Sequence, residues 1–169
     1  MQFINKAYLL IGGNVGNMFL HLHQSVSFLN NECGKVTSYS SVYETAAWGN
    51  EDQPPFLNQA LELETIYPAE ALMPKLLLIE ERMGRKRISK YGPRIIDIDI
   101  LLFNEDIINK PGLVIPHEEL QNRLFALIPL AEIAGNMQHP VLKKSIHQLV
   151  KECDDKLKVE KVIPEIPKF

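Results

Sequence analysis

The stretch IIDIDILLF (residues 95–103) predicts a β-strand whose two faces differ in chemistry. Successive side chains of a strand point to opposite faces, so Asp97 and Asp99 are expected to lie together on one face. The other face is expected to carry the apolar residues Ile96, Ile98, Ile100 and Leu102. The stretch therefore indicates a sheet strand with one buried face and one acidic face.

Outward from this strand, the first hundred residues read strand, helix, strand, strand, helix, strand. The expected ranges are 7–11, 17–31, 36–43, 56–65, 68–84 and 95–103, with a tight turn at Gly12-Gly13-Asn14. Apolar residues recur at spacings of three and four in both helices. Asn17 is expected to cap the first helix, and Pro74 is expected to kink the second. This order is the split βαβ pattern of ferredoxin-like α+β domains.

The predicted fold is a ferredoxin-like βαββαβ core over residues 1–103. Residues 104–169 are expected to extend the same domain with short strands and with helices near 125–134 and 145–152. A chain of 169 residues that is 46% hydrophobic lies in the range of single domains that bury their own core.

Composition excludes several classes of protein. A formal net charge of −3 argues against a chain that coats nucleic acid or an anionic membrane. No apolar run approaches the roughly 18 residues of a membrane span, and no signal segment is visible, so a cytoplasmic protein is expected. Cys33 and Cys153 lack metal-ligand spacing and are expected to be ordinary thiols. No G-x-x-x-x-G-K-[ST] motif is present, which excludes a simple P-loop kinase.

The acidic pair has a spacing that suits a divalent cation. The Cα atoms of Asp97 and Asp99 should lie roughly 6.5 Å apart, so that their carboxylates can converge on hard ions. Mg²⁺ prefers carboxylate, phosphate and water oxygens, which makes metal-bridged polyphosphate the natural ligand. The alternative is an edge strand whose acids only face solvent.

Basic residues precede the acidic strand and favour the phosphate interpretation. Six of the chain's 18 basic residues lie here, namely Arg82, Arg85, Lys86, Arg87, Lys90 and Arg94. Arginine forks bind phosphate oxygens in pairs and stabilise charge on a transferring group. The alternative, a cationic helix C-terminus, accounts for Arg82 and Arg85 but not for a run that continues through a loop.

Five segments carry a resemblance to a known family. They are residues 10–14 (LIGGN), 52–58 (DQPPFLN), 92–99 (GPRIIDID), 116–117 (PH) and 122–125 (NRLF). Over nearly its whole length, the sequence resembles the 6-hydroxymethyl-7,8-dihydropterin pyrophosphokinases. The resemblance implies a ferredoxin-like fold and two Mg²⁺ ions. It also implies transfer of diphosphate from ATP to the pterin hydroxyl, with release of AMP, in folate biosynthesis.

The resemblance also implies roles for individual residues. It implies Asp97 and Asp99 as magnesium ligands, and Arg85 and Arg94 as catalytic, phosphate-binding arginines. The ATP side would comprise Glu80, Arg85, Arg87, Arg94, Ile98, Leu113, His117 and Arg123. The pterin side would comprise Gly12, Thr45, Trp48, Phe56, Asn58 and Phe125, with the two phenylalanines sandwiching the ring.

Three departures from the family pattern concern the edges of the site. The chain reads Ala46-Ala47-Trp48 where relatives have proline and leucine, Tyr91 stands where tryptophan is common, and Glu118 replaces an aromatic residue. The resemblance implies two small-molecule substrates as the partners. Nucleic acid and membrane are not expected as partners, and the chain is expected to be a monomer.

Two other classes of function remain open from the residues alone. One is a non-catalytic ferredoxin-like module that binds nucleotides or RNA through its basic stretch and aromatic residues, although carboxylates on the binding face would repel phosphate. The other is a different metal-dependent transferase with a DxD motif, which keeps Mg²⁺ but changes the acceptor.

Overall fold

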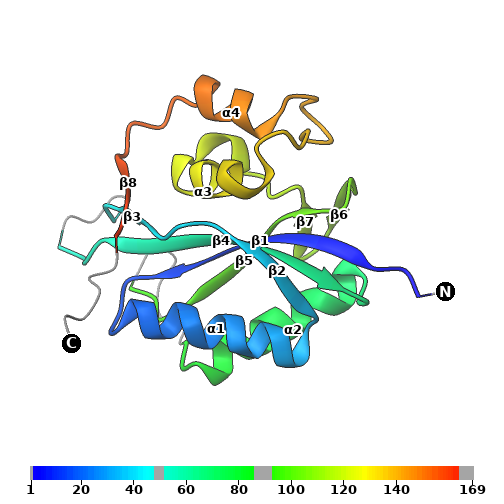
Figure 1. The fold of residues 1–169 in the computed structure, drawn as a ribbon, viewed down its shortest axis with the longest axis horizontal. Coiled ribbons are helices and arrows are strands. Elements are labelled where there is room, and N and C mark those ends of the chain that lie inside the picture. The colour runs from blue at the N-terminus through cyan, green and yellow to red at the C-terminus, as the bar shows by residue number, and fades with distance from the viewer. Residues whose placement is uncertain (1, 48–51, 86–92, 164–169) are drawn as a thin grey trace.

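The computed structural model describes residues 2–47, 52–85 and 93–163. Within these ranges a six-stranded sheet carries helices on both faces (Figure 1). The elements are β1 (Asn5–Gly13), α1 (Met18–Glu32), β2 (Lys35–Tyr39), β3 (Tyr43–Thr45), β4 (Phe56–Thr65), α2 (Ala69–Arg82), β5 (Asp97–Phe103), β6 (Ile108–Lys110), β7 (Leu113–Ile115), the 3₁₀ turn η1 (Leu120–Asn122), α3 (Leu124–Ala134), α4 (Ile146–Glu152) and β8 (Val159–Lys161).

The strand order confirms the ferredoxin-like core. The sheet runs β5-β1-β4-β3-β8, and β2 also pairs with β4. The pairs of β1 with β4 and β5, and of β4 with β2 and β3, are all antiparallel. Asn17 caps α1, as predicted, because its side chain accepts a hydrogen bond from the Leu20 backbone N–H. Pro74 lies inside α2, and the kink there stays a prediction.

Two hydrophobic cores lie on opposite faces of the sheet. One packs alternate residues of the central strands, such as Leu9, Leu61 and Ile98, against α1 and α2. The other packs their neighbours, such as Leu10, against the predicted C-terminal helices α3 and α4. The three layers are visible edge-on in Figure 1. Because successive side chains of a strand point to opposite faces, those of the central strands pack either against α1 and α2 or against α3 and α4.

The predicted strand 36–43 is wrong in one respect, because the structure divides it into β2 and β3. Tyr39 pairs with Leu61 and Tyr43 with Asn58, so four steps on one strand match three on the other. Between them the Ser40 hydroxyl accepts a hydrogen bond from the Ala60 N–H, replacing a backbone acceptor. An extra residue of this kind is a β-bulge, which bends the strand.

The predicted faces of β5 are correct for Ile96, Ile98 and Ile100 but wrong for Leu102. Tyr8 pairs with Leu102 and Leu9 with Ile100, which leaves an extra residue in β5. The alternation reverses at this bulge, so Leu102 joins the core beneath α3 and α4. Both aspartates precede the bulge and keep the face that the alternation predicts.

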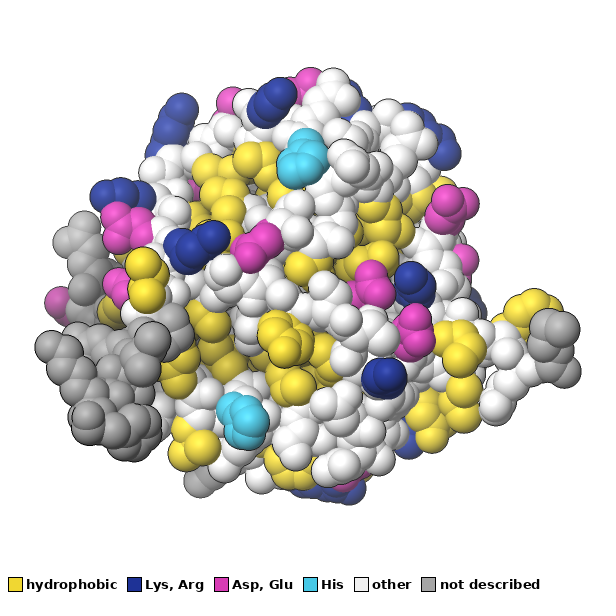
Figure 2. Space-filling view, in the orientation of Figure 1, with side chains coloured by type: hydrophobic (Ala, Val, Ile, Leu, Met, Phe, Trp, Pro, Cys, Tyr) yellow, Lys and Arg dark blue, Asp and Glu magenta, His cyan; other side chains and the backbone are white. Residues whose placement is uncertain are grey.

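The surface mixes hydrophobic and polar side chains, and both cysteines are unpaired. Figure 2 shows hydrophobic side chains in several separate patches divided by polar and charged ones. The segment before β1 projects from the molecule (Figures 1 and 2), and its Phe3 is 85% exposed. Cys33 and Cys153 are both free thiols, as expected. Among the described helices, none has the length and apolarity to cross a bilayer.

Candidate active site

The predicted site residues of three strands meet in one row across the sheet. Gly12 in β1 pairs with Asp97 on one side and with Asn58 on the other. Paired residues point to the same face, so these three positions face the α3 side of the sheet. Neighbouring strands lie about 4.8 Å apart, which separates the acidic and amide positions by roughly 10 Å. Because Gly12 has no side chain, the Asn58 carboxamide can lie directly over β1 between the two neighbouring strands.

A side chain at Gly12 is expected to clash with this carboxamide. A Cβ added there would lie 2.0 Å from Asn58 Oδ1 and 2.7 Å from the Leu57 carbonyl oxygen. Gly12→Ala should destabilise the protein by about 1–3 kcal/mol and raise the KM for the pterin, because the amide must move. Urea unfolding and steady-state kinetics measure both effects. Gly112→Ala is the control: its Cβ meets nothing within 4 Å, but its φ of +77° strains an alanine. It should therefore lose some stability and leave the pterin KM unchanged; equal KM effects would contradict this role for Gly12.

Two arginines converge on Asp97. Arg85 Nη1 lies 2.6 Å from Asp97 Oδ1, and Arg94 Nη1 lies 2.6 Å from Asp97 Oδ2. Burial lowers the pKa of Arg85, but the carboxylates of Asp97 and Glu80 outweigh it and raise that pKa. The Arg85 guanidinium therefore stays charged beside the acidic strand, where the two arginines can meet an anionic ligand.

Glu80 supports this cluster from beneath the edge of the sheet. It lies in α2 and is only 3% exposed. Its Oε1 accepts a hydrogen bond of 2.7 Å from the Ile98 N–H of edge strand β5, and its Oε2 lies 2.7 Å from Arg85 Nη1. Burial, followed by the charge of Asp97, raises the pKa of Glu80. The structure thus gives Glu80 the contacts of a supporting residue that holds Arg85 and β5.

Removal of the Glu80 carboxylate is expected to destabilise the fold. Glu80→Ala leaves the Ile98 N–H without its acceptor and removes one of the two carboxylates paired with Arg85, whose side chain is 14% exposed. This should cost about 3 kcal/mol in the free energy of unfolding. Urea denaturation measures this loss. Glu70→Ala, which breaks the exposed pair of Glu70 with Lys110, is the control and should leave the midpoint unchanged. A wild-type midpoint for Glu80→Ala would contradict this account.

Asp99 lies one pleat further along the same face. Burial, reinforced by the charges of Asp97 and Glu80, raises the pKa of its carboxyl group, while Arg123 and Arg94 lower it. His117 stands nearby; burial and then Arg123 lower its pKa, which favours a neutral imidazole. The His117 Nδ1 accepts a hydrogen bond from the Glu119 N–H, which leaves Nε2 as the donor nitrogen.

The donor set fits a magnesium ion that is shared with a substrate. Within residues 2–47, 52–85 and 93–163, no group of three or more His, Cys, Asp or Glu side chains is arranged to hold a metal. Asp97 and Asp99 supply two carboxylates on one face. Mg²⁺ is commonly held by one or two carboxylates, with phosphate and water oxygens completing an octahedron. The site therefore suits a metal that arrives with a polyphosphate.

The expected pterin residues gather at the other end of the row. Phe56 pairs with Thr45, and Asn58 follows on the same face of β4. Thr45 is 3% exposed, and its hydroxyl oxygen is buried without a hydrogen-bond partner among the residues that the structure describes. Phe125 lies in the first turn of α3, above this face, with the Arg123 guanidinium 5.7 Å from its ring centre. A flat ligand with hydrogen-bonding edges would find aromatic and polar contacts here.

Some predicted residues lie elsewhere. Arg82 pairs with Glu32 of α1 and does not contact the aspartates. Leu113 is 8% exposed and packs in the core beneath the sheet, together with the Ile98 side chain. Arg87, Trp48 and Tyr91 lie outside the described residues. The basic stretch is thus divided, since only its later members face the acidic strand in the described part of the chain.

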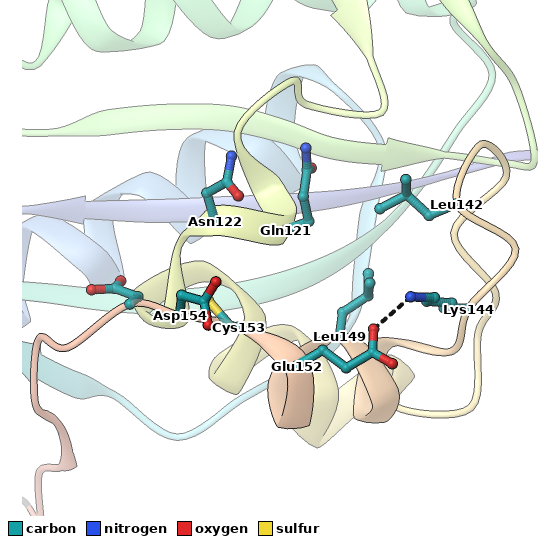
Figure 3. Close-up of a pocket in the computed structure, with 9 residues that line it drawn as sticks. Gln121, Asn122, Leu142, Lys144, Leu149, Glu152, Cys153 and Asp154 are labelled. Atoms are coloured by element: carbon teal, nitrogen blue, oxygen red, sulfur yellow. Dashed lines mark hydrogen bonds and ion pairs between the residues drawn. The ribbon is translucent and has the colours of Figure 1, made fainter.

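Two hollows of the surface lie away from this row. One, of about 460 Å³, lies between η1 and α4 and includes Gln121, Lys144 and Glu152 in its lining (Figure 3). Lys144 and Glu152 form an ion pair of 2.7 Å within it. The other, of about 430 Å³, lies beside the end of α1. Neither hollow is lined by a predicted site residue. We therefore place the candidate active site at the row of Asp97, Gly12 and Asn58.

Known proteins match the chain over most of its length. A family model described as 7,8-dihydro-6-hydroxymethylpterin-pyrophosphokinase (HPPK) matches residues 8–135. The chain belongs to this family. The 2-amino-4-hydroxy-6-hydroxymethyldihydropteridine pyrophosphokinase of Bacillus subtilis is 42% identical over 135 residues, which cover 79% of this chain and 81% of the relative. The enzyme of the same name from Aquifex aeolicus is 38% identical over 145 residues, covering 86% and 90%.

Solved structures agree with the HPPK fold. An HPPK-DHPS triple mutant of Plasmodium falciparum, crystallised with pteroate, superposes with a TM-score of 0.74 at 19% identity. The match covers 89% of this chain and 43% of the Plasmodium chain, so this chain spans less than half of that protein. At this identity the likeness concerns the fold alone.

Sequence reasoning missed the contacts of one residue in the candidate site, Asn14. Asn14 follows β1, and it was expected only as part of a turn. The structure shows it 4% exposed and hydrogen-bonded to two segments that flank the site. An asparagine after a glycine pair suggests a turn by itself, and only the fold brings its partners together.

Proposed function

We propose that this chain transfers the diphosphate of ATP to the hydroxymethyl group of 6-hydroxymethyl-7,8-dihydropterin and releases AMP. Family membership supports the reaction, and the row of Asp97, Gly12 and Asn58 carries the proposal for the site. This row joins an acidic and cationic end, suited to polyphosphate, to an aromatic and polar end, suited to a pterin. ATP is the co-substrate, and the reaction serves folate biosynthesis.

The phosphate half of the site comprises the aspartates and arginines of β5 and its approach. We propose that Asp97 and Asp99 hold two Mg²⁺ ions with the phosphates of ATP. Bound Mg²⁺ neutralises phosphate charge and aligns attacking and leaving oxygens. Arg85 and Arg94 are paired with Asp97 in this structure. When ATP and Mg²⁺ bind at Asp97, the two guanidinium groups would donate hydrogen bonds to phosphate oxygens instead. Arg87, His117 and Arg123 complete the proposed ATP side. Ile98 and Leu113 would border it only at their edge, because both side chains pack in the core beneath the sheet.

The pterin half comprises residues of β3, β4 and α3. Phe56 and Phe125 stack on the ring, and Asn58 and Thr45 bind its polar edge. Gly12 allows the Asn58 carboxamide to lie over β1, and Trp48 is a further proposed pterin contact. Held in this way, the hydroxymethyl oxygen faces the β-phosphorus in line with the bond to the departing AMP. Because phosphoryl transfer needs little covalent help from protein, alignment and charge stabilisation supply most of the catalysis.

The proposal extends to a single-domain monomer that acts in the cytoplasm. Every proposed site residue comes from the same chain, so the site needs no partner subunit. Free thiols at Cys33 and Cys153 suit a reducing compartment. Light scattering at micromolar concentration tests the monomer, since a dimer would double the mass.

The test of the reaction is a product analysis. Purified protein is incubated with ATP and Mg²⁺, with and without hydroxymethyl-dihydropterin, and products are separated and weighed by mass spectrometry. AMP and a pterin diphosphate should form in equal amounts and only when pterin is present. Formation of ADP, inorganic diphosphate or AMP without pterin would favour a different DxD transferase, and intact ATP would favour a binding module.

A further inference from the structure

Asn14 is the buried residue at which the two halves of the site meet. Its backbone N–H donates to the Arg94 carbonyl oxygen at 2.8 Å, and its side-chain Oδ1 accepts from the Arg94 N–H at 2.9 Å. Its Nδ2 donates to the Pro54 carbonyl oxygen at 2.9 Å and to Gln53 Oε1 at 3.1 Å. The carboxamide therefore uses both N–H groups and its oxygen to join chain segments 80 and 40 residues away.

The orientation of this carboxamide is determined by its partners. A backbone N–H can only donate, and a backbone carbonyl can only accept. The Arg94 N–H therefore requires the oxygen of Asn14, while the Pro54 carbonyl requires the nitrogen. An aspartate of the same shape could satisfy Arg94 but not Pro54, and alanine could satisfy neither.

Each segment leads directly into one half of the site. Arg94 places its guanidinium 2.6 Å from Asp97 Oδ2. Pro54 lies two residues before Phe56, with which β4 begins. Because Asn14 is hydrogen-bonded to both segments, a ligand that fixes the position of one segment also constrains the other through Asn14.

We propose that Asn14 is a positioning residue that couples the two substrate half-sites, so that ATP and the pterin each increase the affinity of the other. This inference rests on the proposed function, because it assigns ATP and pterin to the two halves. Coupling between two sites is reciprocal: the factor by which one ligand tightens the other is the same in both directions.

Calorimetry on the full chain measures this factor. The dissociation constant of hydroxymethylpterin is determined with and without saturating Mg²⁺ and α,β-methylene-ATP, whose blocked bond prevents transfer. In wild type the nucleotide analogue should lower that constant at least about fivefold. In Asn14→Asp the coupling factor should fall toward one, while the analogue alone binds within about threefold of wild type because the bond to Arg94 remains.

A matched control lies at the other end of β1. Asn104 also bridges segments, since its Oδ1 accepts from the Lys6 N–H and its Nδ2 donates to Asn5 Oδ1. Asn104→Asp should keep the wild-type coupling factor. Asn14→Ser, which is too short to span both segments, gives the same test if Asn14→Asp does not fold.

The outcomes separate this inference from the proposed function. A wild-type coupling factor near one would overturn the inference, as would an unchanged factor in both Asn14 variants or an equal loss in Asn104→Asp. An equal increase in the dissociation constants of both ligands, with an unchanged coupling factor, would show a merely structural role for Asn14 and would also overturn the inference. If wild type binds neither ligand, the proposed function itself fails.

Discussion

Asp97→Asn and Asp99→Asn are each expected to lower kcat at least about 10²-fold, which is the scale of losing one group that stabilises transition-state charge. Each change keeps the size of the side chain but removes a carboxylate from the face that we assign to Mg²⁺. Extra Mg²⁺ should not restore the rate, because an amide oxygen is a weaker ligand. Initial rates of AMP formation at saturating substrates measure the loss.

The control for this prediction is Asp106→Asn. Asp106 is exposed in the turn that follows β5, and its replacement should leave kcat within about twofold of wild type. Thermal unfolding should show that all three variants remain folded. Near-normal turnover of Asp97→Asn at saturating Mg²⁺ would contradict the role assigned to the acidic strand.

Arg94→Ala is expected to reduce kcat/KM for ATP by about 10²- to 10³-fold. Its guanidinium lies 2.6 Å from Asp97 Oδ2 and is only 27% exposed, so that it faces the proposed phosphate position with little competition from water. Arg94→Lys should recover only part of the loss, because an ammonium lacks the planar fork that binds two oxygens at once. Steady-state kinetics with varied ATP gives both values.

Arg82→Ala supplies the comparison from the same basic stretch. Arg82 pairs with Glu32 on the surface of α1, and its side chain is 44% exposed. Such pairs contribute about 0–1 kcal/mol to stability, so activity and melting temperature should stay near wild type. An equal loss of activity in Arg82→Ala and Arg94→Ala would mean that overall positive charge, not a placed guanidinium, supports the reaction.

Local pattern was sufficient to predict the core of the fold. Apolar periodicity and turn residues gave the order of the core elements, because each helix or strand needs one apolar face for its own layer. The bulges were not predictable in this way. The break at Ser40 and the reversal between Ile100 and Leu102 depend on which residue of a distant strand lies opposite. The sequence of one strand does not determine its register with another.

The candidate site was predictable only in part. The acidic pair of β5 lies on one face as the spacing predicts, because two residues separated by one position share a face of any strand. Family resemblance assigns Glu80 to the ATP side, but its contacts, like those of Asn14, join segments distant in sequence. The sequence neighbourhoods of the two residues suggest only a helix and a turn. Arg82 and Arg85 are close in sequence, yet the helix end directs them to different partners.

The most direct test of the central claim is a crystal structure with Mg²⁺, α,β-methylene-ATP and hydroxymethylpterin. We expect metal density about 2.0–2.1 Å from carboxylate oxygens of both Asp97 and Asp99, bridged to the nucleotide phosphates. The pterin should lie between Phe56 and Phe125 with its edge on Asn58. Metal ions bound elsewhere, or a pterin outside this aromatic pair, would contradict the assignment of the Asp97–Gly12–Asn58 row as the active site.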